Sequence, residues 1–251
     1  MKKALLGVLA ILAMVAIAWA GGDPWKSKPY SQWDEKDVMA VLQTSPWSKV
    51  GVTAQGAWRP EGAAAADTAN LGVAGSASDR SAVTSGASTS QMGGTEKRVA
   101  AIAAQQPYNI FWWSSRTIRE ASARRAVLKG TITQADADKM VSAPIDSYQI
   151  LVSAQNMYIF EQRGEEAFKS AAFLQLHRAK EKLSPTKVEF QKSADGKVVG
   201  AVFNFAKTNP KGEPAISPDE KQIDFELEIG GTWLRTYFTP KQMADNKGED
   251  L

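Results

Sequence analysis

The sequence contains no cysteine and only one histidine. The absence of cysteine excludes disulfides, thiol catalysis, iron–sulfur clusters and thiolate zinc sites. A single imidazole, that of His177, excludes any site that needs two of them. No Gly-x-Ser-x-Gly motif accompanies it, so a serine nucleophile elbow is also missing. We therefore expect His177 to be a surface or structural residue, and the sequence assigns no catalytic residue, no metal site and no cofactor.

The chain also lacks a marked excess of either charge. Its 251 residues include 30 Lys and Arg against 27 Asp and Glu, a net charge of +3. Without Lys2 and Lys3, which belong to the leader described below, the basic excess falls to one. A nearly neutral protein exerts little long-range attraction on nucleic acid or anionic lipid. We therefore predict no nucleic-acid partner.

One long hydrophobic run is present, at the N-terminus. The positively charged Lys2-Lys3 pair precedes an uncharged apolar stretch over residues 4–18, and Ala18-Trp19-Ala20 supplies a small-x-small cleavage pattern. This order is typical of a secretory signal peptide. We predict cleavage after Ala20 and a periplasmic or secreted protein that meets the membrane only transiently, through its signal peptide. The alternative is a retained anchor, since residues 4–22 approach the length of a membrane span.

A change of composition divides the rest of the chain. Ala, Gly, Ser and Thr make up 24 of the 36 residues in 59–94. Such small and polar side chains cannot bury enough apolar area to offset the entropy lost when the segment becomes ordered. We predict a flexible insertion there, within a single α+β domain formed by residues 21–58 and 95–245. Residues 246–251 are expected to be a frayed tail.

Periodicity and capping residues indicate the elements before residue 183. Helices are predicted over 34–42, from Ser114 or Ser115 to Leu128, from Thr133 to Pro144, and over 164–182. The last of these would bury Ala167, Phe168, Ala171, Ala172 and Leu174. Strands are predicted over 47–54, 108–113 and 148–152. The 108–113 segment is apolar on both faces, which is typical of a central strand covered on both sides.

The C-terminal part indicates antiparallel hairpins. Asp195-Gly196 is a turn between a strand at Val188–Phe190 and one over 198–205, and Gly230-Gly231 joins 223–229 to 232–238. Because strands and helices do not alternate regularly, we predict an α+β fold with a mixed, largely antiparallel sheet and three or four helices. The alternative is a β-sandwich with helical insertions.

Three groups of side chains could carry chemistry. Asp224, Glu226 and Glu228 share one face of a strand, where they could hold a hard cation, act as acid and base in glycan hydrolysis, or simply solvate the sheet. We favour solvation. Basic residues on one helix could bind an anion, but they spread around its axis; they are Arg116, Arg119, Arg124, Arg125 and Lys129. The tryptophans are expected to fill the core, and Trp112 and Trp113 to point to opposite faces of a sheet.

Several stretches carry a family resemblance. Ser45-Pro46-Trp47 follows a short helix, Phe203-Asn204-Phe205 leads into Gly212-Glu213-Pro214, and the chain ends in Asp250-Leu251. Together with the exported N-terminus, these resemble uncharacterised secreted proteins of environmental bacteria that are grouped with GWxTD-domain proteins. The resemblance implies export, and it supplies no catalytic residues.

The sequence therefore predicts an exported, non-enzymatic structural or interaction module of the bacterial cell envelope or secretome. Its expected interaction surface is the C-terminal sheet with the proline-containing loop 206–222, and its partner an envelope protein or a glycan. The alternatives are a glycan-active hydrolase that uses the strand carboxylates and an anion-binding module that uses the arginines of 116–125.

Overall fold

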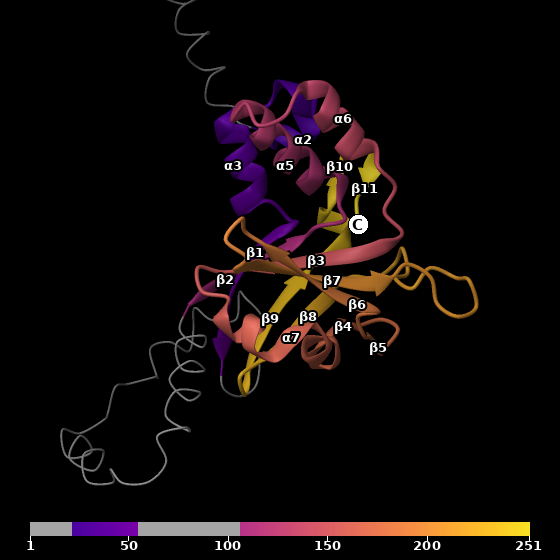
Figure 1. The fold of residues 1–251 in the computed structure, drawn as a ribbon. Helices are drawn as coiled ribbons and strands as arrows, with labels where there is room; N and C mark the ends of the chain where they lie inside the picture. The colour runs from indigo at the N-terminus through magenta and orange to yellow at the C-terminus, as the bar shows by residue number, and fades with distance from the viewer. Residues whose placement is uncertain (1–21, 55–105) are drawn as a thin grey trace, which may run out of the picture.

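The computed structural model describes residues 22–54 and 106–251 (Figure 1). The predicted signal peptide, the predicted insertion over 59–94 and Trp58 lie outside these residues. The described chain has an α+β architecture, in which helices pack around a curled antiparallel sheet. Four of its helices have nine residues or more: α3, α5, α6 and α7.

The N-terminal segment forms three short elements in succession: α2 (Pro24–Ser27), η1 (Tyr30–Gln32) and α3 (Glu35–Thr44). Helix α3 confirms the helix predicted over 34–42. It begins after Asp34, whose side chain accepts a hydrogen bond from the Asp37 backbone N–H, while the Asp37 carboxylate accepts one from the Asp34 backbone N–H. Trp25 and Trp33 are buried here, as expected for core tryptophans.

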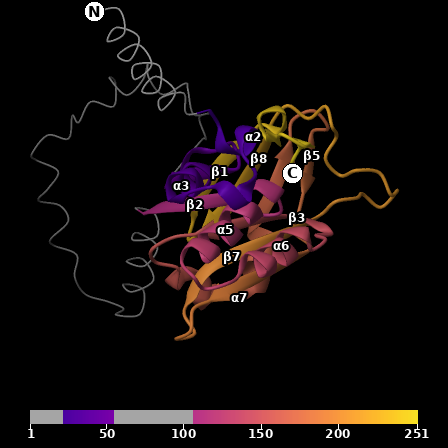
Figure 2. The ribbon, with the colours of Figure 1, turned by 90° about the horizontal axis from the view of Figure 1, so that it is seen from above.

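Two further helices complete a layer above one end of the sheet (Figures 1 and 2). They are α5 (Arg116–Leu128), capped by the Ser115 hydroxyl, and α6 (Gln134–Ser142), capped by that of Thr133. Both caps were predicted from the sequence. Helix α5 packs against α3 and α6, and α3 packs against β1. We call α2, η1, α3, α5 and α6 the helical layer.

Among the described residues nine strands form one sheet, in the order β5-β4-β8-β9-β1-β2-β3-β7-β6, and every ladder is antiparallel. Strand β1 (Ser48–Ala54) joins the two halves, because residues 48–52 pair with β2 and residues 53–54 pair with β9. The predicted central strand is β2 (Pro107–Trp112), next to β3 (Ser147–Ser153). Tyr108, Ile110 and Trp112 of β2 are fully buried, whereas on the other face Asn109 is exposed and Phe111 only partly buried. The strand is therefore not covered on both sides, which corrects that part of the prediction.

The predicted hairpins are confirmed. Strands β6 (Lys187–Lys192) and β7 (Val198–Ala206) flank Asp195-Gly196, and β8 (Ile223–Ile229) and β9 (Thr232–Phe238) flank Gly230-Gly231. The last two glycines have φ of +59° and +85°, values that strain other residues and suit this tight turn.

The helix predicted over 164–182 is wrong in both position and length. Helix α7 spans Tyr158–Ala171 with a kink at Gly164, and the chain then forms β4 (Ala172–Leu176) and β5 (Glu181–Leu183). Ala172, Leu174 and Leu176 are buried in alternation because β4 pairs with β8. Side chains three or four residues apart fit a helix locally, but the ladder with β8 decides in favour of a strand.

The core lies inside the curl of the sheet. Phe203 of β7 contacts Phe225 of β8 across it, with ring centroids 5.5 Å apart, and Trp112 contacts Phe238 at 5.1 Å. Helix α7 packs against β4, β6, β7 and β8, with Phe160 and Phe168 stacked on its inner side. The two halves of the sheet therefore share one apolar interior.

The C-terminal residues are ordered, which corrects the expectation of a frayed tail over 246–251. After η3 (Pro240–Gln242), strands β10 (Ala244–Asp245) and β11 (Gly248–Glu249) form a small hairpin against the helical layer (Figure 1). The Asp250 carboxylate accepts hydrogen bonds from the backbone N–H groups of Arg116 and Thr117, at 2.6 and 2.8 Å. We call residues 243–251 the C-terminal clasp.

Candidate functional site

The three carboxylates of β8 lie on the outward face, as predicted, and each has a polar partner. Glu226 pairs with Arg235, which stands directly opposite on β9, at 3.1 Å. Glu228 pairs with Arg163 of α7 at 3.0 Å. Opposite charges on facing positions stabilise a sheet, which accounts for Glu226, and the ion pair with α7 accounts for Glu228.

Aromatic rings share this outward face with the carboxylates. Phe173 of β4 and Trp233 of β9 meet edge to face, with centroids 6.1 Å apart. Cations already cover both rings: the Lys182 ammonium lies 3.9 Å from the Phe173 centroid, and the Arg235 guanidinium lies 5.2 Å from that of Trp233. A sugar ring would have to displace these cations in order to stack there. Trp233 also shows that the tryptophans do not all serve as core.

The structure gives His177 an acidic partner that the sequence analysis did not foresee. Its Nε2 lies 2.7 Å from the Asp224 carboxylate, which also accepts a hydrogen bond from Gln222 at 2.7 Å. Asp224 is almost fully buried, whereas about half of the imidazole is exposed. The two residues meet because Leu176 and Ile223 are partners in the β4–β8 ladder. No serine hydroxyl within residues 22–54 and 106–251 is hydrogen-bonded to His177, so the pair lacks the nucleophile of a catalytic triad.

Three of the basic residues named for anion binding make contacts within the fold. Arg116 forms two hydrogen bonds with Asp245, at 2.9 and 2.6 Å. Arg119 donates to the carbonyl oxygens of Val141 and Ala143, at 2.7 and 2.9 Å. Arg124 donates to the carbonyl of Trp33 at 2.8 Å. Three of the five cations proposed for anion binding are therefore already used to fasten neighbouring segments to α5.

A polar pocket of about 580 Å³ lies beside α7, in a place that the sequence analysis did not single out. It contains three carboxylates, those of Glu161, Glu165 and Asp195, together with Lys192 and Lys197. Glu161 accepts a hydrogen bond from the Val198 N–H at 2.8 Å, and Glu165 accepts one from the Phe190 N–H at 2.9 Å. The glutamates thus occupy backbone donors of the edge hairpin β6–β7, a means of protecting a sheet edge.

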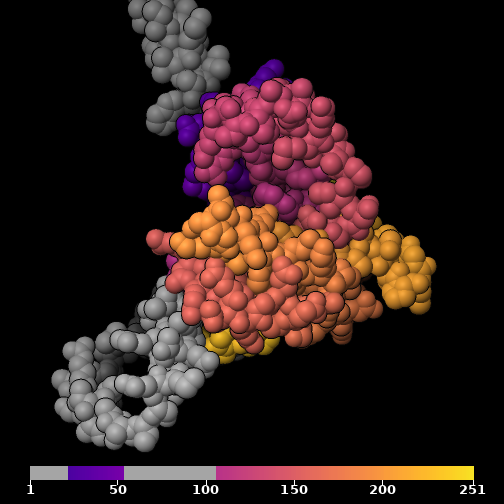
Figure 3. Space-filling model, in the orientation of Figure 1, coloured from indigo at the N-terminus to yellow at the C-terminus, as the bar shows by residue number. Residues whose placement is uncertain are grey.

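The loop between β7 and β8 extends away from the body and ends in an ordered hairpin (Figures 1 and 3). We call residues 207–215 the projecting hairpin. Ala215 donates its N–H to the Lys207 carbonyl at 2.8 Å, and Asn209 donates its own to the Glu213 carbonyl at 2.8 Å. The Asn209 side-chain oxygen accepts from the N–H groups of Lys211 and Glu213, at 2.9 and 3.0 Å. The hairpin is therefore held mainly by its own hydrogen bonds.

The base of the projecting hairpin is anchored in the body. Ile216 and Glu220 are buried, and Glu220 accepts a hydrogen bond from the Arg178 N–H at 2.9 Å. On the other side, the Lys207 ammonium lies 5.5 Å from the ring centroid of Tyr148. Burial lowers the pKa of Lys207, and the nearby charge of Arg119 lowers it further. The exposed tip, from Pro210 to Pro214, thus stands on a fixed base.

Within the described part of the chain, no three His, Cys, Asp or Glu side chains lie close enough together to bind a metal ion. No helix in that part has both the length and the apolar character needed to cross a bilayer.

The chain matches no family model, no curated protein and no solved structure. The interpretation of its sites therefore depends on their geometry alone.

Proposed function

We propose that the protein is an exported, non-enzymatic interaction module of the bacterial cell envelope or secretome, and that the projecting hairpin is its recognition element. The observation that carries the proposal is the hairpin itself: polar, exposed and ordered by its own hydrogen bonds. A loop that is rigid before binding loses little entropy when a partner covers it, which favours affinity. Binding residues are also concentrated on loops that a rigid scaffold positions.

The carboxylates of β8 support a non-enzymatic role. A glycosidase needs one carboxyl group that holds a proton and a second one free to act as nucleophile or base. Glu226 and Glu228 are instead paired with arginines, and Asp224 with His177 and Gln222. These contacts engage all three carboxylates in the fold.

We propose that residues 21–58 and 95–245 form one domain, since β1 contributes to both halves of the sheet, and that residues 246–251 belong to it through the contacts of the C-terminal clasp. We also propose that the chain is related to the secreted proteins grouped with GWxTD-domain proteins, although the Gly-Trp-x-Thr-Asp string is absent.

Export itself is tested by the mass of the protein recovered from the envelope or medium, which should correspond to a chain that begins at Gly21. Recovery of only the full-length precursor in the cytosol would contradict it.

A deletion tests the recognition element. Replacing residues 208–214 with Asn-Gly joins Lys207 to Ala215 by a two-residue turn, for which the bond between Ala215 N–H and Lys207 carbonyl already has the right spacing. We expect this variant to keep its melting temperature but to lose the partner that the intact protein recovers from envelope extract. The control is Lys139→Glu on exposed α6, which should recover the partner as the intact protein does. Equal recovery by the deletion variant would contradict the proposal.

A second candidate function is a glycan-active hydrolase, and the pocket beside α7 is the observation that favours it. If cell-wall glycans are cleaved, Glu161→Gln and Glu165→Gln should each abolish turnover, whereas Glu226→Gln should leave it unchanged. Turnover that survives both pocket substitutions would contradict this candidate.

A further inference from the structure

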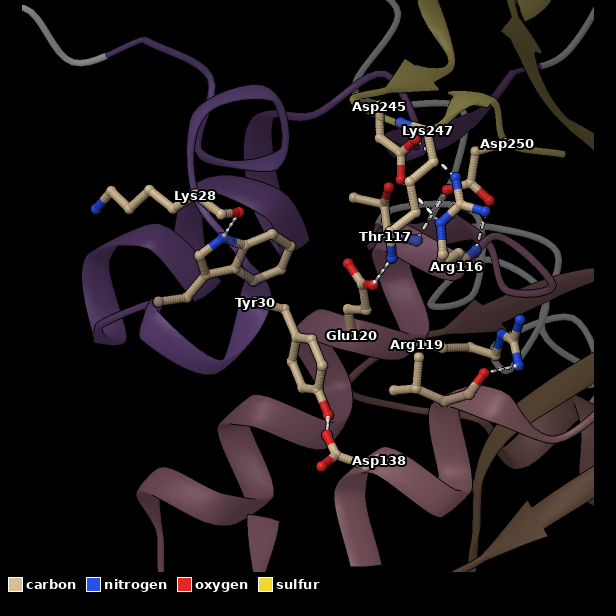
Figure 4. Close-up of polar contacts among 12 residues, drawn as sticks. Lys28, Tyr30, Arg116, Thr117, Arg119, Glu120, Asp138, Asp245, Lys247 and Asp250 are labelled. Atoms are coloured by element: carbon tan, nitrogen blue, oxygen red, sulfur yellow. Dashed lines mark hydrogen bonds and ion pairs between the residues drawn. The ribbon is translucent and has the colours of Figure 1, made fainter. Parts of the chain in front are cut away.

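The C-terminal clasp connects the end of the chain to residues more than 100 positions earlier. The Trp47 indole donates to the Asp250 carbonyl at 2.7 Å, while the Asp250 carboxylate binds two N–H groups at the start of α5. The Arg116–Asp245 pair stands beside these bonds (Figure 4), and Met243 is fully buried. The clasp therefore fastens the helical layer to the end of β9.

The charges in this contact are well matched. Both oxygens of Asp245 bind the Arg116 guanidinium, and both oxygens of Asp250 accept from backbone donors. A carboxylate at a helix N-terminus satisfies donors that the helix cannot, and it interacts favourably with the helix dipole. Breaking this contact costs free energy, because it leaves charged and polar groups without hydrogen-bond partners.

The elements that receive the clasp have stabilising contacts of their own. Helix α5 has a local cap, since the Ser115 hydroxyl accepts from the Ile118 N–H, and it packs against α3 and α6. The clasp follows β9 directly in the chain, and β9 is held by its ladders with β1 and β8, so we expect the clasp to reach its site after these ladders have formed. Its own strands have two residues each and cannot form a stable hairpin alone. Contacts between distant residues are also slow to form.

We propose that the C-terminal clasp is a lock that closes last, after the rate-limiting step of folding, and then slows unfolding. In an exported chain, such a lock would leave the helical layer loosely held until residues 243–251 had crossed the membrane. That consequence rests on the export proposed above, whereas the order of folding does not.

The test is a comparison of folding and unfolding rates in the full mature chain, followed by tryptophan fluorescence. Trp25, Trp33, Trp47 and Trp112 are all buried and report on formation of the core and helical layer. For Asp250→Asn we expect the unfolding rate to rise about tenfold while the refolding rate changes less than about twofold, the pattern of a contact absent from the transition state. Glu249→Gln, on the exposed part of the clasp, should change neither rate.

A second variant keeps the proposal testable if Asp250→Asn does not fold. Asp245→Asn weakens the pair with Arg116 and the hydrogen bond that Asp245 accepts from the Lys247 N–H, but leaves the Asp250 contacts in place. We expect about a threefold faster unfolding with unchanged refolding. Slower refolding that accounts for most of the stability loss in either variant would place the clasp in the folding nucleus and overturn the proposal. Unchanged unfolding in both variants would overturn it as well. Neither result would bear on where the protein is located.

Discussion

Two short polar hairpins near the C-terminus differ in how they are held. The projecting hairpin (207–215) bonds mainly to itself and exposes its tip, whereas the clasp (243–251) directs its carboxylates into the body. Similar composition thus gives one segment whose tip is exposed and another whose carboxylates contact the body. If the projecting hairpin is the recognition element, as we propose, the position of a charged residue, rather than its type, separates recognition from stability.

Removing each hairpin in turn should produce the largest contrast. Deletion of residues 244–251 leaves the Trp47 indole, the Arg116 guanidinium and two N–H groups of α5 without their partners. At about 1–3 kcal/mol for each buried polar group, we expect the free energy of unfolding to fall by at least about 4 kcal/mol. Replacing 208–214 with Asn-Gly should lower it by less than about 1 kcal/mol. Urea titration measures both free energies of unfolding, and equal losses in the two variants would contradict the difference between the two hairpins.

A conservative change of one cation should sharpen the comparison. Arg116→Lys keeps the charge but loses the two parallel hydrogen bonds to Asp245, so we expect a loss of about 1–2 kcal/mol. The matched exchange in the projecting hairpin, Lys211→Arg, should change stability by less than about 0.5 kcal/mol. Thermal melts measure both effects, and equal shifts in the melting temperature of the two variants would contradict the difference between the clasp and the projecting hairpin.

The pH dependence of stability should differ between the same two regions. Burial raises the pKa of Glu120, which contacts Lys247 of the clasp, although the lysine charge partly opposes the rise. The folded protein therefore binds this proton more tightly than the unfolded chain does. Its contribution to stability is complete below the pKa of the unfolded state and is lost as pH rises through the folded pKa.

Glu120→Gln should accordingly flatten the fall of stability with rising pH, measured by urea titration over about pH 4 to 8. The control, Glu213→Gln in the projecting hairpin, should leave the slope unchanged, because that side chain is exposed. If Glu120→Gln does not change the slope of the unfolding free energy against pH, the burial of Glu120 does not contribute to the pH dependence of stability.

The smallest effect is expected at the tip of the projecting hairpin. Asn209→Ala removes the side-chain acceptor for Lys211 and Glu213 without exposing core, so global stability should change by less than about 0.5 kcal/mol. The amides of these two residues should nevertheless exchange with deuterium at least about tenfold faster. Unchanged exchange would mean that the body, and not the hairpin itself, holds the loop in place.

What the sequence predicted correctly was encoded locally. The β8–β9 hairpin was found to the residue because alternation and Gly230-Gly231 are both short-range signals. The boundary at Ala172 was missed, since only pairing with β8 makes that segment a strand. The order of the C-terminus was missed for the same reason: the partners of Asp250 lie 133 and 134 residues away in the sequence.

In the candidate site, too, local features were predicted and long-range contacts were missed. The shared outward face of Asp224, Glu226 and Glu228 follows from the two-residue period of a strand and was predicted. Their partners were not, because His177 and Arg163 arrive from other elements. The pocket beside α7 also needed the tertiary arrangement of α7 and β6–β7. The proline-containing loop was found through its composition, but its internal order depends on Asn209 contacts that composition does not specify.

Site-specific photo-crosslinking in intact cells tests the central claim most directly. A photoreactive amino acid is placed at Lys211 in the projecting hairpin and, separately, at Lys139 on α6, which is similarly exposed. We expect one discrete adduct from position 211 that is absent from position 139. No adduct at 211, or the same adducts from both positions, would contradict the assignment of the projecting hairpin as the recognition element.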